Sequence, residues 1–326
     1  MLKVGLIGCG FMGAMHANCY RNIDGVNVVA FADIRKEKAE ALAKGTSAAI
    51  YGDGYDLIAN ADVDIIDICL PTYLHTKYAI KAMEKVKYVF IEKPVALTAE
   101  EGNELLEKSL ATGCQVQVGQ VIRFWDEYVV LKEIIESGKY GKVVNANFRR
   151  LSPRPDWGWQ DWLLDHTRSG GAGQDLHIHD IDYVLSIFGE PKSFHSIKNI
   201  HSEKNSYVNT ILQYEDHVIG VEGTWDLPST YPFTATFRVV FEKAVVQNAD
   251  GKFMLYTNDG KEEIAIEKKV LAGGDAGGNI SDLGGYYNEL VYFTEKAKHG
   301  EAIENATLAD GVSSLKFLLN ELAYKA

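Results

Sequence analysis

The stretch that decides the fold is Val4-Gly5-Leu6-Ile7-Gly8-Cys9-Gly10-Phe11-Met12-Gly13, where a short apolar run leads directly into three closely spaced glycines. G-x-G-x-x-G between a strand and a helix is typical of a dinucleotide-binding turn. The first glycine permits the tight turn, the second lets the backbone approach a pyrophosphate, and the third allows close helix–strand packing. The pyrophosphate is expected at the amino end of the helix, where N–H groups and the dipole favour an anion. We predict that the cofactor contacts Gly8, Gly10, Phe11, Met12 and Gly13.

An acidic residue at position 33 is the second feature that indicates dinucleotide binding. Asp33 follows the apolar run Val26–Ala32 and lies twenty residues after Gly13. A carboxylate at this point accepts hydrogen bonds from ribose hydroxyls and disfavours a 2′-phosphate. Arg35 is either a solvated arginine at a helix start or a partner for such a phosphate. We assign Asp33, Ile34 and Arg35 to the cofactor site and predict NAD, with NADP as the alternative.

Short β-branched runs alternate with amphipathic helical stretches in the first 121 residues. The predicted strands are Val4–Ile7, Val26–Ala32, Ile65–Leu70, Tyr88–Ile91 and Gln115–Val118. The predicted helices are Met12–Arg21, Lys36–Ala43, Thr76–Lys85 and Ala99–Ala111. Such alternation favours a doubly wound parallel sheet covered on both faces. Residues 1–121 are therefore predicted to form a Rossmann NAD(P)-binding domain.

The pattern changes in residues 122–326, which we assign to a second, α/β domain for substrate binding and oligomerisation. A helix near 127–137 and a strand at 143–149 come first. Successive strands then follow without intervening helices at 207–214, 218–225, 234–241, 244–248 and 253–256. Runs of this kind indicate an antiparallel sheet. Helices near 286–298 and 308–324 close the chain, and the glycine-rich run Leu271–Asn279 is predicted to be a loop.

Polar residues follow several of the predicted parallel strands. Because the carboxyl edge of an open α/β sheet binds the ligand, these residues are expected to border the cofactor. Lys93 ends a buried strand and precedes Pro94, so its backbone is stiff; it is either a catalytic residue or an ordinary ion-pair partner. The predicted cofactor contacts of this group are Leu70, Pro71, Thr72, His75, Glu92, Lys93 and Gln120.

A glycine-rich run, Gly170–Gly173, opens a helix that carries Asp175 and His179. These two residues are four apart and so share one face. The alternative interpretations are a helix cap for Asp175 and a satisfied core histidine for His179. No metal site is predicted, because His177 and His179 point in different directions on a helix.

Aromatic residues are concentrated in the stretch 157–162. Indole faces stack on the C–H faces of sugar rings, although the same residues could form a hydrophobic clasp between domains. The predicted substrate contacts are Lys93, Arg123, Trp159, Gln160, Trp162, Asp175, His179 and Tyr231.

Taken in order, these motifs resemble the Gfo/Idh/MocA family, named after glucose–fructose oxidoreductase, inositol dehydrogenase and a rhizopine catabolism protein. The likeness spans nearly the whole chain. It is carried by Gly8–Gly13, Asp33, Pro71 with His75, Glu92-Lys93-Pro94, and the glycine-rich run before Asp175 and His179.

The resemblance implies a Rossmann domain followed by an α/β domain with a large, open, mainly antiparallel sheet that commonly forms a homodimer or homotetramer interface. It maps a catalytic set onto Lys93, Asp175 and His179, and it implies a carbohydrate or cyclitol substrate oxidised at a secondary hydroxyl. A histidine titrates near neutrality, so His179 suits the general base. Lys93 could stabilise the developing alkoxide or accept the proton itself. Asp175 could orient the imidazole or bind a neighbouring hydroxyl.

Two other functions share this scaffold: a redox-neutral glycoside hydrolase that uses NAD transiently, and a non-catalytic nucleotide sensor. The sensor reading predicts loss of the Lys/Asp/His set, and the chain retains all three residues.

Composition limits the partners and the compartment. The chain has 326 residues, 46% of them hydrophobic, and a formal charge of −12. Nucleic acid and anionic membrane are not expected as partners, because both need clustered positive charge. The four cysteines form no C-x-x-C pair and are predicted to be reduced. Together with the absence of a signal-peptide pattern, this predicts a cytoplasmic protein.

Overall fold

The computed structural model describes residues 1–198, 206–266 and 283–325. They divide into two compact units, one of residues 1–124 and 269–313 and one of residues 125–268 and 314–326. The first break lies close to the boundary expected at residue 121. The described residues 283–313, however, belong to the first unit, whereas we expected them in the second domain. The run Leu271–Asn279 lies outside the described residues.

The first unit contains a six-stranded, fully parallel sheet in the order β3-β2-β1-β4-β5-β6. This order is that of a Rossmann fold and confirms the predicted doubly wound sheet. β3 was not predicted; it has three residues, too few to show a period. The strands are β1 (Leu2–Ile7), β2 (Val26–Ala32), β3 (Ala49–Tyr51), β4 (Ile65–Ile68), β5 (Tyr88–Ile91) and β6 (Gln115–Val118).

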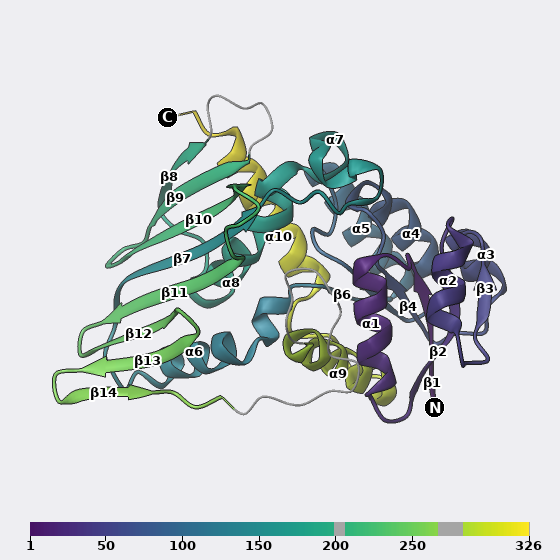
Figure 1. The fold of residues 1–326 in the computed structure, drawn as a ribbon, viewed down its shortest axis with the longest axis horizontal. Coiled ribbons are helices and arrows are strands. Elements are labelled where there is room, and N and C mark those ends of the chain that lie inside the picture. Colours follow the sequence, from purple (N-terminus) through teal and green to yellow (C-terminus); the bar gives the residue numbers. More distant parts are fainter. Residues whose placement is uncertain (199–205, 267–282, 326) are drawn as a thin grey trace. The chain divides into compact units, whose positions relative to one another are not determined.

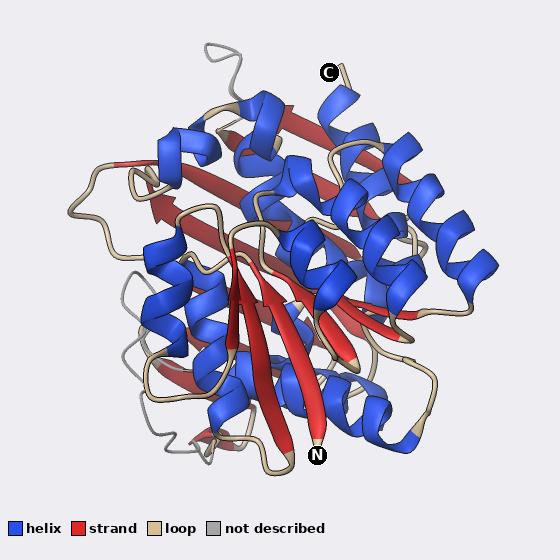
Figure 2. Ribbon diagram, turned by 90° about the vertical axis from the view of Figure 1, so that its right-hand side faces the viewer, coloured by secondary structure: helices blue, strands red, loops and turns tan. Residues whose placement is uncertain are grey.

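Helices cover both faces of this sheet (Figure 2). On one face Phe90 of β5 meets Phe293 of α9, with ring centroids 5.4 Å apart. On the other face the Gly5 backbone lies close to Leu57 of α3. The helices of this unit are α1 (Phe11–Arg21), α2 (Lys36–Ala43), α3 (Gly54–Asn60), α4 (His75–Lys85), α5 (Ala99–Thr112), α9 (Gly284–His299) and the start of α10 (Leu308–Ala323), with short 3₁₀ turns at Thr72–Leu74 and Val121–Phe124.

The second unit contains an eight-stranded sheet in the order β14-β13-β12-β11-β7-β10-β9-β8 (Figure 1). Only β7 and β10 pair in parallel, so the sheet is mainly antiparallel, as predicted. Its strands are β7 (Val143–Pro153), β8 (Ser193–Lys198), β9 (Tyr207–Gln213), β10 (Val218–Leu227), β11 (Thr234–Phe241), β12 (Ala244–Ala249), β13 (Lys252–Thr257) and β14 (Gly260–Glu263).

Helices α6 (Asp126–Ser137) and α8 (Ile178–Phe188) pack on one face of this second sheet. Tyr128 of α6 contacts Phe237 edge-on, and Tyr183 of α8 contacts Phe148, with centroids 5.0 and 5.9 Å apart. The opposite face carries side chains that are exposed in the single chain, among them Ile197, Ile211 and Tyr256.

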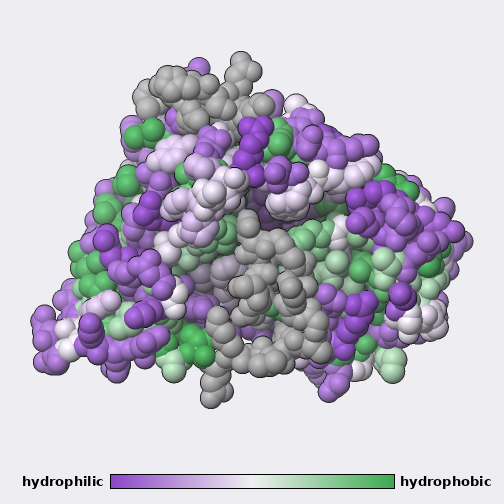
Figure 3. All heavy atoms as spheres, in the orientation of Figure 1, coloured by the Kyte–Doolittle hydropathy of each residue, from purple (hydrophilic) through white to green (hydrophobic). Residues whose placement is uncertain are grey.

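Polar and apolar residues are mixed on the surface shown in Figure 3. Among the described residues, no helix is both long enough and apolar enough to cross a membrane. The four cysteines are all free and buried, which confirms the prediction of reduced thiols.

A buried ion pair joins the second sheet to helix α8. Arg150 donates to Asp180 through Nε and one terminal nitrogen, at 2.8 and 3.2 Å, and also lies 5.6 Å from the Trp125 ring. The Arg150 and Asp180 side chains are 2% and 0% exposed. Removing one partner of such a pair leaves an uncompensated buried charge.

We therefore expect Arg150→Met to lower the free energy of unfolding by about 3–5 kcal/mol, measured by chemical denaturation. The double variant Arg150→Met/Asp180→Asn should recover part of this loss. Arg149→Met is the matched control on the same strand, because Arg149 is half exposed and its pair with Glu222 should contribute less than about 1 kcal/mol. Equal losses in the Arg149 and Arg150 variants would contradict the assignment.

Candidate active site

The space around the three glycines of the β1–α1 turn fits the roles predicted for them. Gly8 has φ +93°, and a Cβ there would lie 2.5 Å from the Cys69 carbonyl oxygen. A Cβ on Gly13 would lie 1.9 Å from the Gly8 carbonyl oxygen, so helix α1 approaches the end of β1 as closely as a backbone can. A Cβ on Gly10 meets nothing closer than 3.8 Å, which leaves the backbone open to a ligand.

The amino end of α1 suits an anion. The helix starts at Phe11, its N-cap is Gly10, and no acidic residue occupies its first turn. Phe11 and Met12 therefore contribute backbone to a positive helix end whose own first turn carries no acidic residue. These observations fit the pyrophosphate of a dinucleotide.

Asp33 lies just beyond β2 and is 8% exposed. Its carboxylate accepts hydrogen bonds from the backbone N–H groups of Cys9 and Arg35, both at 2.8 Å. The Arg35 guanidinium also lies against it, with Nε 3.3 Å from Oδ1. Asp33 thus ties the glycine turn to the loop after β2, and Arg35 sits beside the predicted ribose site. Ile34 between them is 65% exposed.

The loop after β4 is held by a buried histidine. The His75 ring places Nε2 2.7 Å from the Leu70 carbonyl oxygen and Nδ1 2.8 Å from the Pro94 carbonyl oxygen. Burial lowers the pKa of His75, an effect that the two carbonyl groups oppose. His75 therefore links the ends of β4 and β5. Thr72, next to Pro71, is also buried.

Glu92, Lys93 and Gln120 follow β5 and β6 at the same edge. The Glu92 carboxylate is buried, and its Oε2 accepts a hydrogen bond from the Lys93 backbone N–H at 3.1 Å. Lys93 is half-buried. The Gln120 side chain is 1% exposed, and its amide has no hydrogen-bond partner among the described residues. A buried amide without a partner fits a site that receives a polar ligand.

Behind this edge lies a polar cluster that the sequence patterns did not reveal. His16 of α1 contacts Asp67 in the middle of β4 at 2.8 Å, and Tyr20 donates to the same carboxylate at 2.9 Å. All three are buried. Asp67 lies within a strand that reads as a continuous apolar run, so the only available signal was a single acidic residue inside that run.

Three potential metal ligands gather in this cluster, since ligand atoms of His16, Asp67 and Cys69 lie within 4.8 Å of one another. They already bond to each other: the Cys69 sulfur lies 3.3 Å from His16 Nδ1 and 3.4 Å from Asp67 Oδ1. Hydrogen bonding thus accounts for their approach. The absence of a metal site stays a prediction.

In the second unit, Asp175 lies in a π-helical turn, Gly173–His177, which leads into α8. We expected a regular helix here. Such turns occur mostly as single π-bulges and frequently mark functional sites. His177 anchors the turn through Glu321 of α10, with Nε2 2.8 Å from Oε1. Asp175 is half-buried, and His179 is 8% exposed.

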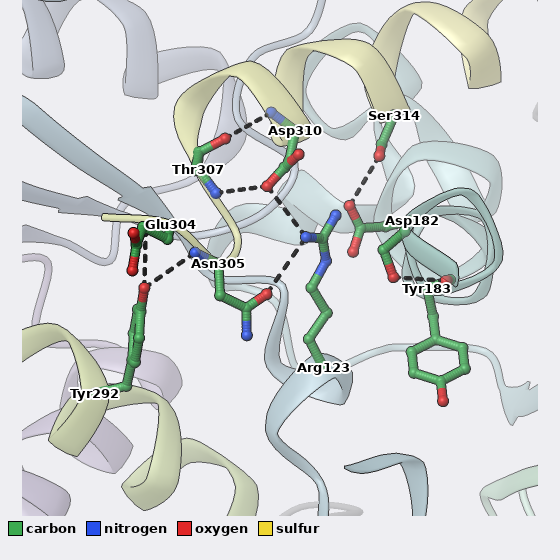
Figure 4. A network of polar contacts seen from close by, with 10 residues as sticks. Arg123, Asp182, Tyr183, Tyr292, Glu304, Asn305, Thr307, Asp310 and Ser314 are labelled. Carbon is green, nitrogen blue, oxygen red and sulfur yellow. Dashed lines mark hydrogen bonds and ion pairs between the residues drawn. The ribbon is translucent and has the colours of Figure 1, made fainter. Parts of the chain in front are cut away.

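Arg123 belongs to the first unit and is bonded to the start of α10 (Figure 4). Its guanidinium lies 3.1 Å from Asp310 and 3.5 Å from the Asn305 side chain. The Thr307 and Asp310 side chains each accept a hydrogen bond from the other's backbone N–H, so they form a capping box at the start of this helix. Arg123 therefore has structural partners in addition to any substrate role.

The other predicted substrate contacts belong to the second unit. Trp159, Gln160 and Trp162 form a 3₁₀ segment, Trp159–Leu164, in which Gln160 has a left-handed φ of 51°. The Arg168 guanidinium donates a hydrogen bond to the Gln160 backbone carbonyl oxygen at 2.7 Å. Tyr231 is 38% exposed, in the loop between β10 and β11.

The three residues of the predicted catalytic set are divided between the two units. Lys93 is in the first unit, and Asp175 and His179 are in the second.

Comparison with known proteins assigns the family. Residues 2–120 match the family model described as "Oxidoreductase family, NAD-binding Rossmann fold", and residues 128–247 match the "GFO/IDH/MocA C-terminal domain". The chain belongs to the Gfo/Idh/MocA family of oxidoreductases. Its first unit is accordingly an NAD-binding Rossmann domain.

Relatives of known name are similar over part of their length. Myo-inositol 2-dehydrogenase of Thermotoga maritima is 31% identical over 194 residues, which cover 58% of this chain and 55% of that protein. Inositol 2-dehydrogenase of Burkholderia cenocepacia is 38% identical over 217 residues, or 65% of this chain and 61% of that protein. The matches thus span somewhat more than half the length of these relatives.

Solved structures share the fold over nearly the whole chain. Levoglucosan dehydrogenase in complex with NADH and levoglucosan has a TM-score of 0.84 at 21% identity, covering 99% of this chain and 96% of that chain. A putative myo-inositol dehydrogenase from Sinorhizobium meliloti has a TM-score of 0.80 at 24% identity, covering 99% and 98%.

The glycine geometry makes a testable distinction. Gly10→Ala should keep the unfolding midpoint of the wild type, because the added methyl group has space, yet weaken NAD binding at least tenfold by occupying the path of the pyrophosphate. Gly13→Ala should lower the free energy of unfolding by about 1–3 kcal/mol, because the methyl group meets the Gly8 carbonyl. Thermal unfolding and NAD titration measure both. Unchanged NAD affinity in Gly10→Ala would place the pyrophosphate elsewhere.

Proposed function

We propose that this protein is an NAD(P)-dependent dehydrogenase that oxidises a secondary hydroxyl of a sugar, sugar derivative or inositol. The observation that carries the proposal is the arrangement at one sheet edge: the glycine turn, Asp33 and the Glu92-Lys93 pair all follow parallel strands of the NAD-binding unit. The names of the related inositol 2-dehydrogenases supply the substrate class.

NAD, when bound, supplies the hydride acceptor. Lys93 Nζ donates a hydrogen bond to the reacting oxygen and stabilises its developing negative charge. His179 accepts the hydroxyl proton, since an imidazole titrates near neutral pH. Asp175, on the turn before it, orients the imidazole or binds a neighbouring hydroxyl.

The direct test is formation of NADH or NADPH with a panel of inositols, sugars and sugar acids. A clear signal with one polyol is expected. If no compound of the panel gives NADH or NADPH while NAD still binds, the result contradicts the proposal and favours a redox-neutral hydrolase or a nucleotide sensor. Release of sugar without net NADH would identify the hydrolase.

Variants of the proposed catalytic residues test the mechanism. Lys93→Met and His179→Ala should each lower kcat about 10²–10⁴-fold, with the Kd of NAD changed less than about threefold. Lys87→Met is the matched control, because Lys87 is exposed at the opposite end of β5. Near-normal turnover in either catalytic variant would remove that residue from the mechanism.

Cofactor choice is tested at the loop after β2. Asp33→Asn should weaken NAD about tenfold and NADP less, because the carboxylate is the acceptor for the ribose hydroxyls. Arg35→Ala should weaken NADP and leave NAD nearly unchanged if the guanidinium binds a 2′-phosphate. Parallel titrations with both nucleotides measure the ratio, and an unchanged ratio in Asp33→Asn would show that Asp33 does not contact the ribose.

We further propose a homodimer or homotetramer formed through the sheet face that carries Ile197, Ile211 and Tyr256, in the cytoplasm. Apolar side chains on an uncovered sheet face support such an interface.

A further inference from the structure

His16 is held between two carboxylates inside the first unit. It lies on α1, three residues after Gly13, and is 0% exposed. Its Nδ1 is 2.8 Å from Asp67 Oδ2, and its Nε2 is 3.0 Å from Glu92 Oε1. Nδ1 shares a hydrogen bond with Asp67, whereas Nε2 approaches Glu92 at ion-pair distance without hydrogen-bond geometry.

Glu92 continues this contact to the neighbouring lysine. Its two oxygens are divided, with Oε1 facing His16 and Oε2 accepting the Lys93 backbone N–H at 3.1 Å. The Glu92 side chain is 7% exposed, so these partners replace water. A continuous path of contacts thus runs from the helix that begins at the glycine turn to the Lys93 backbone.

The surroundings of His16 favour its charged form. Burial by itself would lower the pKa of His16, but the Asp67 carboxylate and the Cys69 sulfur raise it well above the usual value. Cys19 and Tyr20 of its own helix also lie in the cluster, and their pKa values are raised, first by burial. Glu289 of α9 is fully buried, and burial raises its pKa well above the usual range.

We propose that His16 is a positioning residue: through Glu92 it fixes the backbone of Lys93 relative to the nucleotide bound at the start of the same helix. The inference rests on the proposed role of Lys93 in hydride transfer. Helix α1 is then a single rigid element with two tasks. Its first turn receives the pyrophosphate, and its second turn holds the catalytic loop.

Two substitutions separate the two contacts of the ring. The amide nitrogen of asparagine can occupy the place of Nδ1, and that of glutamine can occupy the place of Nε2. His16→Asn keeps a hydrogen-bond donor toward Asp67 and loses the close contact with Glu92, whereas His16→Gln keeps a group at the Glu92 contact and loses the donor toward Asp67. We expect kcat to fall about tenfold or more in His16→Asn and to stay within about threefold of wild type in His16→Gln, with the KM of the polyol and the Kd of NAD little changed in both.

Tyr20→Phe is the matched control for damage to the cluster. It removes the 2.9 Å bond to Asp67 and leaves the Glu92 contact in place. It should lower the thermal unfolding midpoint and keep kcat. If His16→Asn does not fold, Glu92→Gln tests the same contact, because it keeps the shape of the side chain and removes the negative charge that lies 3.0 Å from His16 Nε2.

A second readout does not depend on turnover. After reductive ¹³C-methylation of the lysines, the Lys93 resonance is assigned by its loss in Lys93→Arg. Its chemical shift should move in His16→Asn and Glu92→Gln and stay in place in His16→Gln and Tyr20→Phe. If wild type oxidises no polyol, the proposed function fails, while this signal still tests the position of Lys93.

Two results would overturn the inference. Equal loss of kcat and equal shifts in His16→Asn and His16→Gln would show that His16 serves only the stability of the unit. Stoichiometric zinc in the purified protein, lost in both His16→Gln and Cys69→Ser, would show that the cluster is a metal site instead.

Discussion

The contact between Gly13 and the Gly8 carbonyl sets the position of helix α1, and most features of the first unit follow from it. A side chain at residue 13 would lie 1.9 Å from that oxygen, so only glycine allows the helix to lie this close to the end of β1. The close approach brings the amino end of the helix to the sheet edge where Asp33 and Lys93 lie. It also carries the next turn of the helix over β4, where His16 reaches Asp67.

This geometry explains why charged groups can be buried in a sheet that is otherwise apolar. Four neighbouring strands place one residue each side by side on the face that α1 and α9 cover. These residues are Leu6, Asp67, Phe90 and Gln117. A lone carboxylate there would be costly. His16, Tyr20 and Cys69 each offer Asp67 a hydrogen-bond donor, so the desolvation cost is offset by charge-assisted bonds. The cluster requires the helix to be where the glycines put it.

The features that could be predicted from the sequence are those encoded by local patterns. Apolar runs predict the main strands, and the glycine turn with Asp33 predicts the nucleotide-binding unit. The short elements β3 and α3 were not predicted, because segments of three and seven residues are too short to show a clear hydrophobic period. The assignment of 283–313 to the first unit was not predicted, because packing between segments that are distant in the chain produces no local sequence pattern.

In the candidate site, too, some residues could be predicted from local patterns and others could not. Lys93, Asp175 and His179 were marked by motifs, yet the residues that hold them were not. The π-turn under Asp175 depends on the bond between His177 and Glu321, 144 residues apart. Beside Lys93, His16 contacts Glu92 and His75 contacts the Pro94 carbonyl, both of which are distant in sequence from these histidines. A motif records which side chain touches a ligand, whereas the contacts that fix its position are made by residues that only the folded chain brings together. Precision in a site of this kind therefore depends on buried residues outside the motifs, and these are the residues on which the mechanism has next to be tested.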